Sequence, residues 1–153
     1  MSDATLARLT IGLSLAGFVI ALYFTLAYYG RAKKARWVPK VLCPRAESNC
    51  VTVVQTPYAR IFRVPNSLLG AIYYLALIVW ISLPTNEAHW YATHLEFVEL
   101  TGKILLAAGA AAVLLGFYLI YALRRILRTD CPLCYTAHAI NAALLVLLIF
   151  LAR

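Results

Sequence analysis

Four long apolar stretches alternate with polar segments along the chain. They cover residues 9–29, 66–84, 100–123 and 131–152. Within them, Lys103 is the only Lys, Arg, Asp or Glu. A helix rises 1.5 Å per residue, so each stretch is long enough to cross roughly 30 Å of hydrocarbon. The pattern therefore predicts an all-α integral membrane protein, a bundle of four transmembrane helices forming a single domain over residues 1–153.

The first and third stretches carry the clearest membrane signals. The first is predicted to be a retained transmembrane helix, because its apolar part is too long for a signal peptide and no small-residue cleavage pattern follows it. The third is rich in Ala and Gly, including Gly109 and Gly116, which is typical of tightly packed membrane helices. Residues 85–99 are expected to connect the second stretch to the third.

The second stretch begins after Pro65, a favourable helix start with Asn66 or Ser67 as cap. Asn66, Gly70 and Tyr74 follow one another at intervals of four residues, so they share one helix face. Gly70 on that face allows either a close helix contact or room for a ligand. The alternative is that Asn66 only caps the helix and Tyr74 only packs.

Residues 30–64 form the longest polar segment and carry two of the four cysteines, Cys43 and Cys50. We expect one or two short helices here, interrupted at Pro57, lying on the membrane surface and packed over the mouth of the bundle. A loop of this length between bundle helices is usually functional.

The predicted topology brings the cysteines together. Four spans place both chain ends on one side of the membrane, so residues 30–64 and the polar segment after the third span share the other side. Cys43 and Cys50 are therefore expected at the same end of the bundle as Cys131 and Cys134, although about eighty residues separate the two pairs.

Cys131 and Cys134 form a Cys-x-x-Cys motif at the start of the last stretch. Two thiols three residues apart on a first helical turn lie on one face, close enough to form a disulfide. The unpaired N–H groups and the positive end of the helix dipole favour a thiolate there. Asp130 is a plausible N-cap, and its negative charge opposes this effect.

Composition, charge and the motifs that are missing make several classes of function less favoured. The chain is 63% hydrophobic with a net charge of +8, which is typical of a membrane protein and not of a nucleic-acid-binding protein. No nucleotide-binding glycine motif and no Ser/His/Asp arrangement is present. A transporter would need ionisable or broken-helix features at mid-membrane, and His138, one turn into the last stretch, is the nearest.

The Cys-x-x-Cys motif and its predicted proximity to the loop pair indicate a redox function. Such a function requires an electron acceptor, and no motif for flavin, nicotinamide or haem is present. A membrane quinone would reach the bundle mouth from the bilayer and needs only an apolar slot with a few polar groups. Asn66, Tyr74 and His138 are the polar candidates beside the cysteine pair. A structural disulfide and a zinc site built from the four thiols remain alternatives, although the gap between Cys43 and Cys50 is wide for zinc.

Over nearly its full length the chain resembles the vitamin K epoxide reductase family, in its prokaryotic disulfide-forming branch. The most specific parts are the loop pair Cys43 and Cys50, the stretch TPYARIFRVPNSLLGAIYY, and the Cys131–Cys134 motif followed by Ala-Ile-Asn. The resemblance implies a four-helix bundle around a quinone, capped by the loop that carries the first cysteine pair.

The resemblance also implies an electron path. A reduced thioredoxin-like partner passes electrons to Cys43, Cys43 and Cys50 form the shuttle disulfide, and Cys50 exchanges with Cys131. Cys134 is then the cysteine next to the quinone, and Asn66 matches the family position that hydrogen-bonds a quinone oxygen. Each transfer between cysteines is a thiolate attack through a mixed disulfide.

The chain departs from the family pattern at three places. Gln55-Thr56 replaces a Ser-Ser pair found in many members, and His138 stands where vertebrate members carry a tyrosine. Some bacterial members carry a fused thioredoxin-like domain, whereas this chain stops at Arg153, so its partner is expected to be a separate protein. The predicted function is quinone-dependent formation of disulfides in partner proteins. Quinone or quinone-epoxide reduction as the main role, and a zinc-stapled membrane scaffold, are the alternatives.

The basic residues predict the orientation of this multi-pass protein. Eleven of the fourteen Lys and Arg residues lie on the cysteine side, and the other side carries Arg8, Lys103 and Arg153. The positive-inside rule therefore predicts that the cysteines face the cytoplasm. Most relatives place them outside or in a lumen, so sequence and family precedent disagree. We favour the cytoplasmic orientation, which suits organisms with disulfide-rich intracellular proteins.

Overall fold

The computed structural model describes residues 3–31, 52–61, 63–83 and 88–151. Its long helices are α1 (Asp3–Tyr28), α3 (Asn66–Ser82), α4 (Ala88–Tyr121) and α5 (Pro132–Leu151). Its shorter elements are a helical turn at residues 52–55, the 3₁₀-helix η3 (Pro57–Ala59), strands β1 (Arg60–Ile61) and β2 (Val64–Pro65), and the π-helix η4 (Ala122–Leu127). Helix α1 packs against α3 and α5, and α4 packs against α5 and, less extensively, α3.

Among the described residues, three helical segments are long and apolar enough to cross a membrane. They are Ala4–Tyr28, Glu96–Leu127 and Pro132–Leu151, and α3 is a shorter apolar helix of 17 residues. Large apolar side chains such as Ile72, Leu114 and Phe117 are exposed on the outer faces of these helices. Exposed apolar surface of this extent is typical of lipid contact. The described chain is thus largely helical and built for a membrane, as the apolar pattern predicts.

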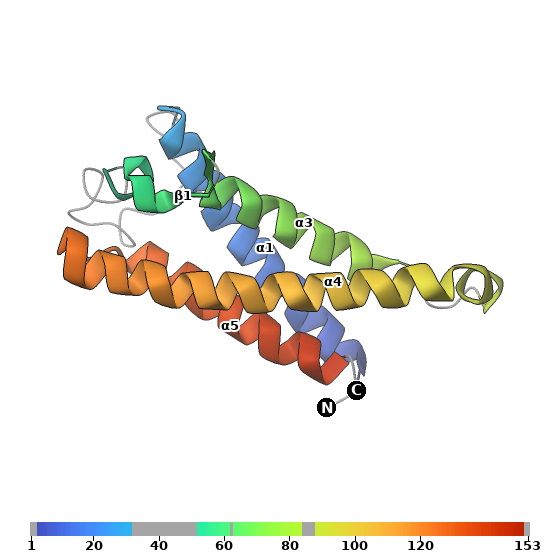
Figure 1. Cartoon of the computed structure of the whole chain (residues 1–153). Coiled ribbons are helices and arrows are strands. Elements are labelled where there is room, and N and C mark those ends of the chain that lie inside the picture. The colour runs from blue at the N-terminus through green and yellow to red at the C-terminus, as the bar shows by residue number, and fades with distance from the viewer. Residues whose placement is uncertain (1–2, 32–51, 62, 84–87, 152–153) are drawn as a thin grey trace.

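Figure 1 shows that α1 begins near the place where α5 ends. The end of α1, the start of α3, η4 and the start of α5 lie together at the opposite end of the helices. A hydrogen bond of 3.0 Å from Thr25 Oγ1 to Ser67 Oγ joins the first two of these. We call this opposite end the cysteine end, because Cys131 and Cys134 lie there.

Two helix ends at the cysteine end have identifiable causes. After α1 the chain makes a Schellman motif, in which Gly30 at φ +70° donates its N–H to Ala27 O and Arg31 donates to Leu26 O. After η4, Arg128 has a φ of 49°, and its N–H and that of Thr129 both donate to Leu123 O. A non-glycine residue at positive φ is uncommon, and this one turns the chain into the Cys131–Cys134 motif.

Helix α4 begins at Ala88, twelve residues before the expected start at 100, so most of the expected connection over 85–99 is helical. The sequence from 88 to 101 contains no Pro or Gly to stop a helix. The expected start differs because an apolar stretch marks only the part of a helix that can lie in lipid. The helix α4 itself extends beyond that part into the polar residues before it.

The segment after the loop cysteines is described from residue 52. As expected, the helical turn 52–55 stops before Pro57, and η3 begins at that proline. The short antiparallel pairing of β1 with β2 was not expected from the sequence. Val53 and Val54 are buried beside Cys131 and Cys134. Cys43 and Cys50, with the rest of residues 32–51, lie outside the described residues.

Candidate functional site

Cys131 occupies the N-cap position of α5, directly before Pro132 at the first helical position. Its Sγ accepts a hydrogen bond of 3.3 Å from the backbone N–H of Cys134, which is the third helical residue. A side chain that accepts from the third N–H is the usual N-cap arrangement. The expectation that Asp130 is the cap is therefore wrong. Asp130 Oδ1 instead accepts a hydrogen bond of 3.1 Å from the hydroxyl of Tyr135.

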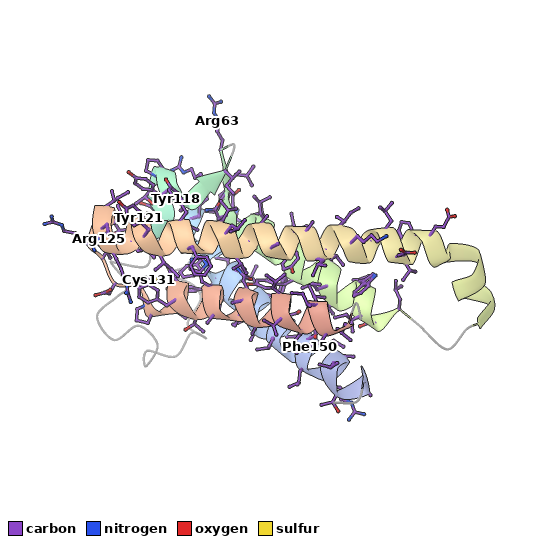
Figure 2. The ribbon with its side chains drawn as sticks, turned by 60° about the horizontal axis from the view of Figure 1, so that its bottom comes forward. Arg63, Tyr118, Tyr121, Arg125, Cys131 and Phe150 are labelled. Carbon is purple, nitrogen blue, oxygen red and sulfur yellow. The ribbon has the colours of Figure 1, made fainter. Side chains whose placement is uncertain are left out.

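Both cysteines of the motif are buried at the cysteine end, Cys131 completely. They share an apolar cluster with residues from α1, the 52–55 turn and η4, among them Phe24, Val53 and Leu123. Figure 2 shows Cys131 at the same end of the helices as Tyr121 and Arg125, with Phe150 toward the other end. The cluster keeps water away from the motif on these sides.

A cavity of about 360 Å³ lies beside the motif, between the long helices. Cys134 belongs to its lining. Most of the wall is apolar, with Phe24 and Ala21 from α1, and Ala111 and Leu115 from α4. A mostly apolar pocket of this size with a few polar groups is typical of a small-molecule site.

Several polar side chains of the cavity wall have partners within the protein. The Tyr74 hydroxyl donates a hydrogen bond of 2.6 Å to Asn141 Oδ1. Thr56 Oγ1 donates to Val53 O at 2.7 Å, and Ser67 Oγ accepts from Thr25. These groups are satisfied without a ligand, so they shape the wall.

Three other buried polar atoms of the wall have no hydrogen-bond partner in the described part of the chain. They are Asn66 Oδ1, Tyr73 OH and His138 Nδ1. The Nδ2 atom of Asn66 donates a hydrogen bond of 3.3 Å to Tyr58 O. A buried polar atom without a partner is costly and calls for an explanation, and here all three line one cavity.

Glycines of α4 stand directly opposite two of these atoms. A Cβ built on Gly116 would lie 2.8 Å from His138 Nδ1, and one built on Gly109 would lie 2.6 Å from Tyr73 OH. Both contacts are too close for a real side chain. The sequence suggested only tight helix packing at these glycines, but they also leave space for polar groups of the cavity.

The sequence candidates in α3 and α5 come together as follows. Asn66, Gly70 and Tyr74 line the cavity from α3, and Cys134 and His138 line it from α5. The alternative that Asn66 is only a helix cap is wrong, since the N-cap of α3 is Pro65 and no side-chain cap hydrogen bond is made. Gly70 makes no unusually close contact, because a Cβ there would meet Tyr74 and Ala21 at ordinary distances.

Sequence reasoning missed Tyr73 and Asn141, which also line the cavity. Tyr73 lies seven residues after Asn66, and two helical turns return to the same face. Asn141 lies seven residues after Cys134 in the same way. This spacing could have identified both.

Metal binding has no support from the part of the chain that the structure describes, which holds no group of three His, Cys, Asp or Glu side chains suited to a metal ion. The zinc alternative needs Cys43 and Cys50, which are outside the described residues, so it stays untested.

The family model of the vitamin K epoxide reductase family matches residues 8–149, nearly the whole chain. The matched range contains all four cysteines and every residue of the cavity wall. No curated protein matches the chain.

Proposed function

The chain belongs to the vitamin K epoxide reductase family, and we propose that it acts in the prokaryotic branch of that family, forming disulfides in partner proteins. Members are oxidoreductases linked to quinones, so this chain is a membrane oxidoreductase. In the proposed path, electrons from a separate thioredoxin-like protein pass through Cys43 and Cys50. They continue to Cys131 and Cys134, and from there to a membrane quinone.

The position of the Cys131–Cys134 pair carries this proposal. Cys134 lines the apolar cavity, and Cys131 is fully buried beside it in the cluster with Val53 and Val54. Cys50 precedes Thr52, the first described residue of that segment, by only two positions. This arrangement supports an exchange between Cys50 and Cys131 on one side of the pair and electron delivery from Cys134 on the other.

The N-cap hydrogen bond suits Cys131 to thiol–disulfide exchange. An N–H that donates to sulfur binds a thiolate more strongly than a neutral thiol, because the bond becomes charge-assisted. The helix dipole of α5 adds to this preference. A stabilised thiolate is a good leaving group, so the mixed disulfide between Cys50 and Cys131 is readily opened by attack at Cys50, with Cys131 leaving.

Each proposed exchange is balanced without a further reactant. A thiolate attacks one sulfur of a disulfide, a new S–S bond forms, and the displaced sulfur leaves as a thiolate. Over the whole path the partner loses two electrons and two protons as its two thiols become a disulfide. A bound quinone supplies the acceptor chemistry, since it takes up two electrons and two protons.

The cavity residues fit a quinone. The apolar wall matches the faces of a ring, and the unpartnered polar atoms match its oxygens. Asn66 uses one Nδ2 hydrogen on Tyr58 O, which leaves a second hydrogen to donate and Oδ1 to accept. Such a side chain can bind a quinone oxygen in both of its forms, the carbonyl of the oxidised ring and the hydroxyl of the reduced ring. We propose that Asn66, Tyr74 and His138 hold the quinone. Asn66 and His138 would bond to its oxygens, and Tyr74, whose hydroxyl is already bound to Asn141, would support the ring from the wall.

The proposed topology has four spans in one domain, with α3 as the span between α1 and α4. At 1.5 Å per residue its 17 residues extend about 25 Å, and bilayers accommodate short spans by local thinning. Residues 30–64 then form a loop that covers the cysteine end. The burial of Val53 and Val54 beside the cysteine motif supports this cover.

Anaerobic reduction of added quinone by a dithiol, measured on the purified protein and on each Cys→Ala variant, tests the proposed function. The wild-type protein should reduce the quinone, and Cys134→Ala should not. Quinone reduction by Cys134→Ala at the wild-type rate would rule out this assignment.

A further inference from the structure

The hydroxyl of Tyr73 is the unpartnered group of the cavity wall that no role above uses. It is buried and makes no hydrogen bond to the described residues. Its neighbour Tyr74 differs, because its hydroxyl donates to Asn141. Burying a hydroxyl without a partner costs free energy. A ligand oxygen at this place would recover that cost.

The surroundings of Tyr73 place its hydroxyl against α4, at the wall of the cavity. On α4, Gly109 lies opposite the hydroxyl, where any larger residue would collide with it. Ala108, Ala111 and Ala112 of the same helix also line the cavity. Small residues on this face of α4 leave room beside the Tyr73 side chain. The hydroxyl is closed off by its neighbours, and a small turn of the side chain would bring it to a ligand in the cavity.

Tyr73 and Asn66 lie on the same face of α3, about two turns or roughly 10 Å apart along the helix axis. Both line the same cavity, and both carry an unpartnered buried atom. The cavity thus offers two hydrogen-bonding positions separated along α3, with apolar wall between them. A ligand that fits has two oxygens on opposite edges of an apolar ring.

We propose that the Tyr73 hydroxyl donates a hydrogen bond to the quinone oxygen remote from Asn66. This inference rests on the proposed function and adds a second fixed point for the ring. A donor at each end stabilises the negative charge that both oxygens gain on reduction. It also selects quinones with two opposed oxygens over flat molecules that are only apolar.

Equilibrium binding separates this inference from turnover. Cys134→Ala protein, which should not turn over, is titrated with menadione by calorimetry in one fixed detergent. Adding Tyr73→Phe should weaken menadione binding roughly five- to tenfold, as expected for one lost hydrogen bond. Tyr118→Phe is the matched control, since Tyr118 is exposed on α4 and absent from the cavity wall. It should leave the affinity unchanged.

Methylnaphthalene, which has the ring and methyl group of menadione without its oxygens, tests packing. Tyr73→Phe should leave its affinity unchanged. An equal loss for both molecules, or menadione affinity within about twofold of the parent protein, would overturn the role of the hydroxyl. Failure of the wild-type protein to reduce quinone would contradict the proposed function. It would leave the binding test of Tyr73 intact, because binding is measured without turnover.

A second variant reaches the same hydroxyl from α4. Gly109→Ala should displace the Tyr73 side chain and weaken menadione binding by a similar factor. Gly12→Ala is its control, because a Cβ at Gly12 meets nothing within 4 Å. Unchanged menadione binding in a folded Gly109→Ala protein would contradict the inference.

Discussion

The hydroxyl of Tyr74 on α3 donates a hydrogen bond of 2.6 Å to Oδ1 of Asn141 on α5. The Tyr74 ring also lies against Gly17 of α1, where an added Cβ would come within 2.5 Å of it. Residues from three helices therefore meet at one side chain, which is almost completely buried. The contact fixes the inner wall of the cavity, so changes here should be visible in stability.

Tyr74→Phe should destabilise the protein by about 1–3 kcal/mol, because it leaves the partly buried Asn141 side chain without its donor. Thermal unfolding in detergent measures the loss. Replacing both groups, as Tyr74→Phe with Asn141→Leu, should cost less than the sum of the single changes, since no polar group is then left unpaired. Strictly additive losses would show that the hydrogen bond does not contribute.

Gly17→Ala should also destabilise the protein, by about 1–3 kcal/mol, because the added methyl group would overlap the Tyr74 ring. Gly12→Ala on the same helix is the control. It has open space and should be neutral or slightly stabilising, since alanine favours a helix. Equal melting temperatures for the two variants would mean that α1 and α3 can separate without cost.

These residues also show how far the sequence alone could lead. Apolar length located the three membrane-length helices that the structure describes. Spacing within each helix, together with the predicted topology, placed Asn66, Tyr74 and His138 beside the cysteine pair. The N-cap differs from the expectation, because Asp130 is the better cap by residue type, whereas in the structure the sulfur of Cys131 accepts the cap hydrogen bond. The hydrogen bonding of Tyr73 and Tyr74 could not be predicted from the sequence. Which of these two adjacent tyrosines has a partner depends on where α5 places Asn141.

Asn66→Ala should slow quinone reduction roughly tenfold to a thousandfold, the range for losing a donor to an oxygen that gains charge. The rate should be measured with quinone and dithiol in excess, and thermal unfolding should be followed in parallel. The variant should remain folded, although it loses the hydrogen bond to Tyr58 O. For comparison, His138→Ala should have a weaker effect than Asn66→Ala, and that effect should be on quinone affinity. Unchanged kinetics in Asn66→Ala would limit this residue to holding η3.

The order of the proposed relay is tested by two electron donors. Cys43→Ala should block oxidation of a thioredoxin-like protein but spare turnover with a small dithiol that reaches Cys131 and Cys134 directly. Cys134→Ala should abolish both reactions, because Cys134 is the cysteine of the motif that lines the cavity. Equal loss with both donors in Cys43→Ala would argue against a shuttle role for the loop pair.

Orientation is the prediction on which sequence and family precedent disagree. Eleven of the fourteen basic residues belong to the two segments on the cysteine side. All those that the structure describes, Arg31, Arg60, Arg63, Arg124, Arg125 and Arg128, are exposed. On the other side, Lys103 is paired with Glu99 at 2.7 Å. Such a bias over short segments predicts that the cysteine end faces the cytoplasm.

Thiol labelling of intact cells decides the orientation. The protein is expressed, reduced with a permeant dithiol, and treated with a membrane-impermeant thiol reagent before or after the cells are opened. Cys43 should be labelled only after opening, and Cys43→Ala provides the background. A Cys placed in the segment before α3, on the cysteine side, should be labelled as Cys43 is. A Cys added beyond Arg153, on the other side, should show the opposite pattern. Labelling of Cys43 in unbroken cells would overturn the cytoplasmic orientation. The basic residues would then face outward and bind lipid headgroups or an acidic partner. The redox proposal would be unaffected.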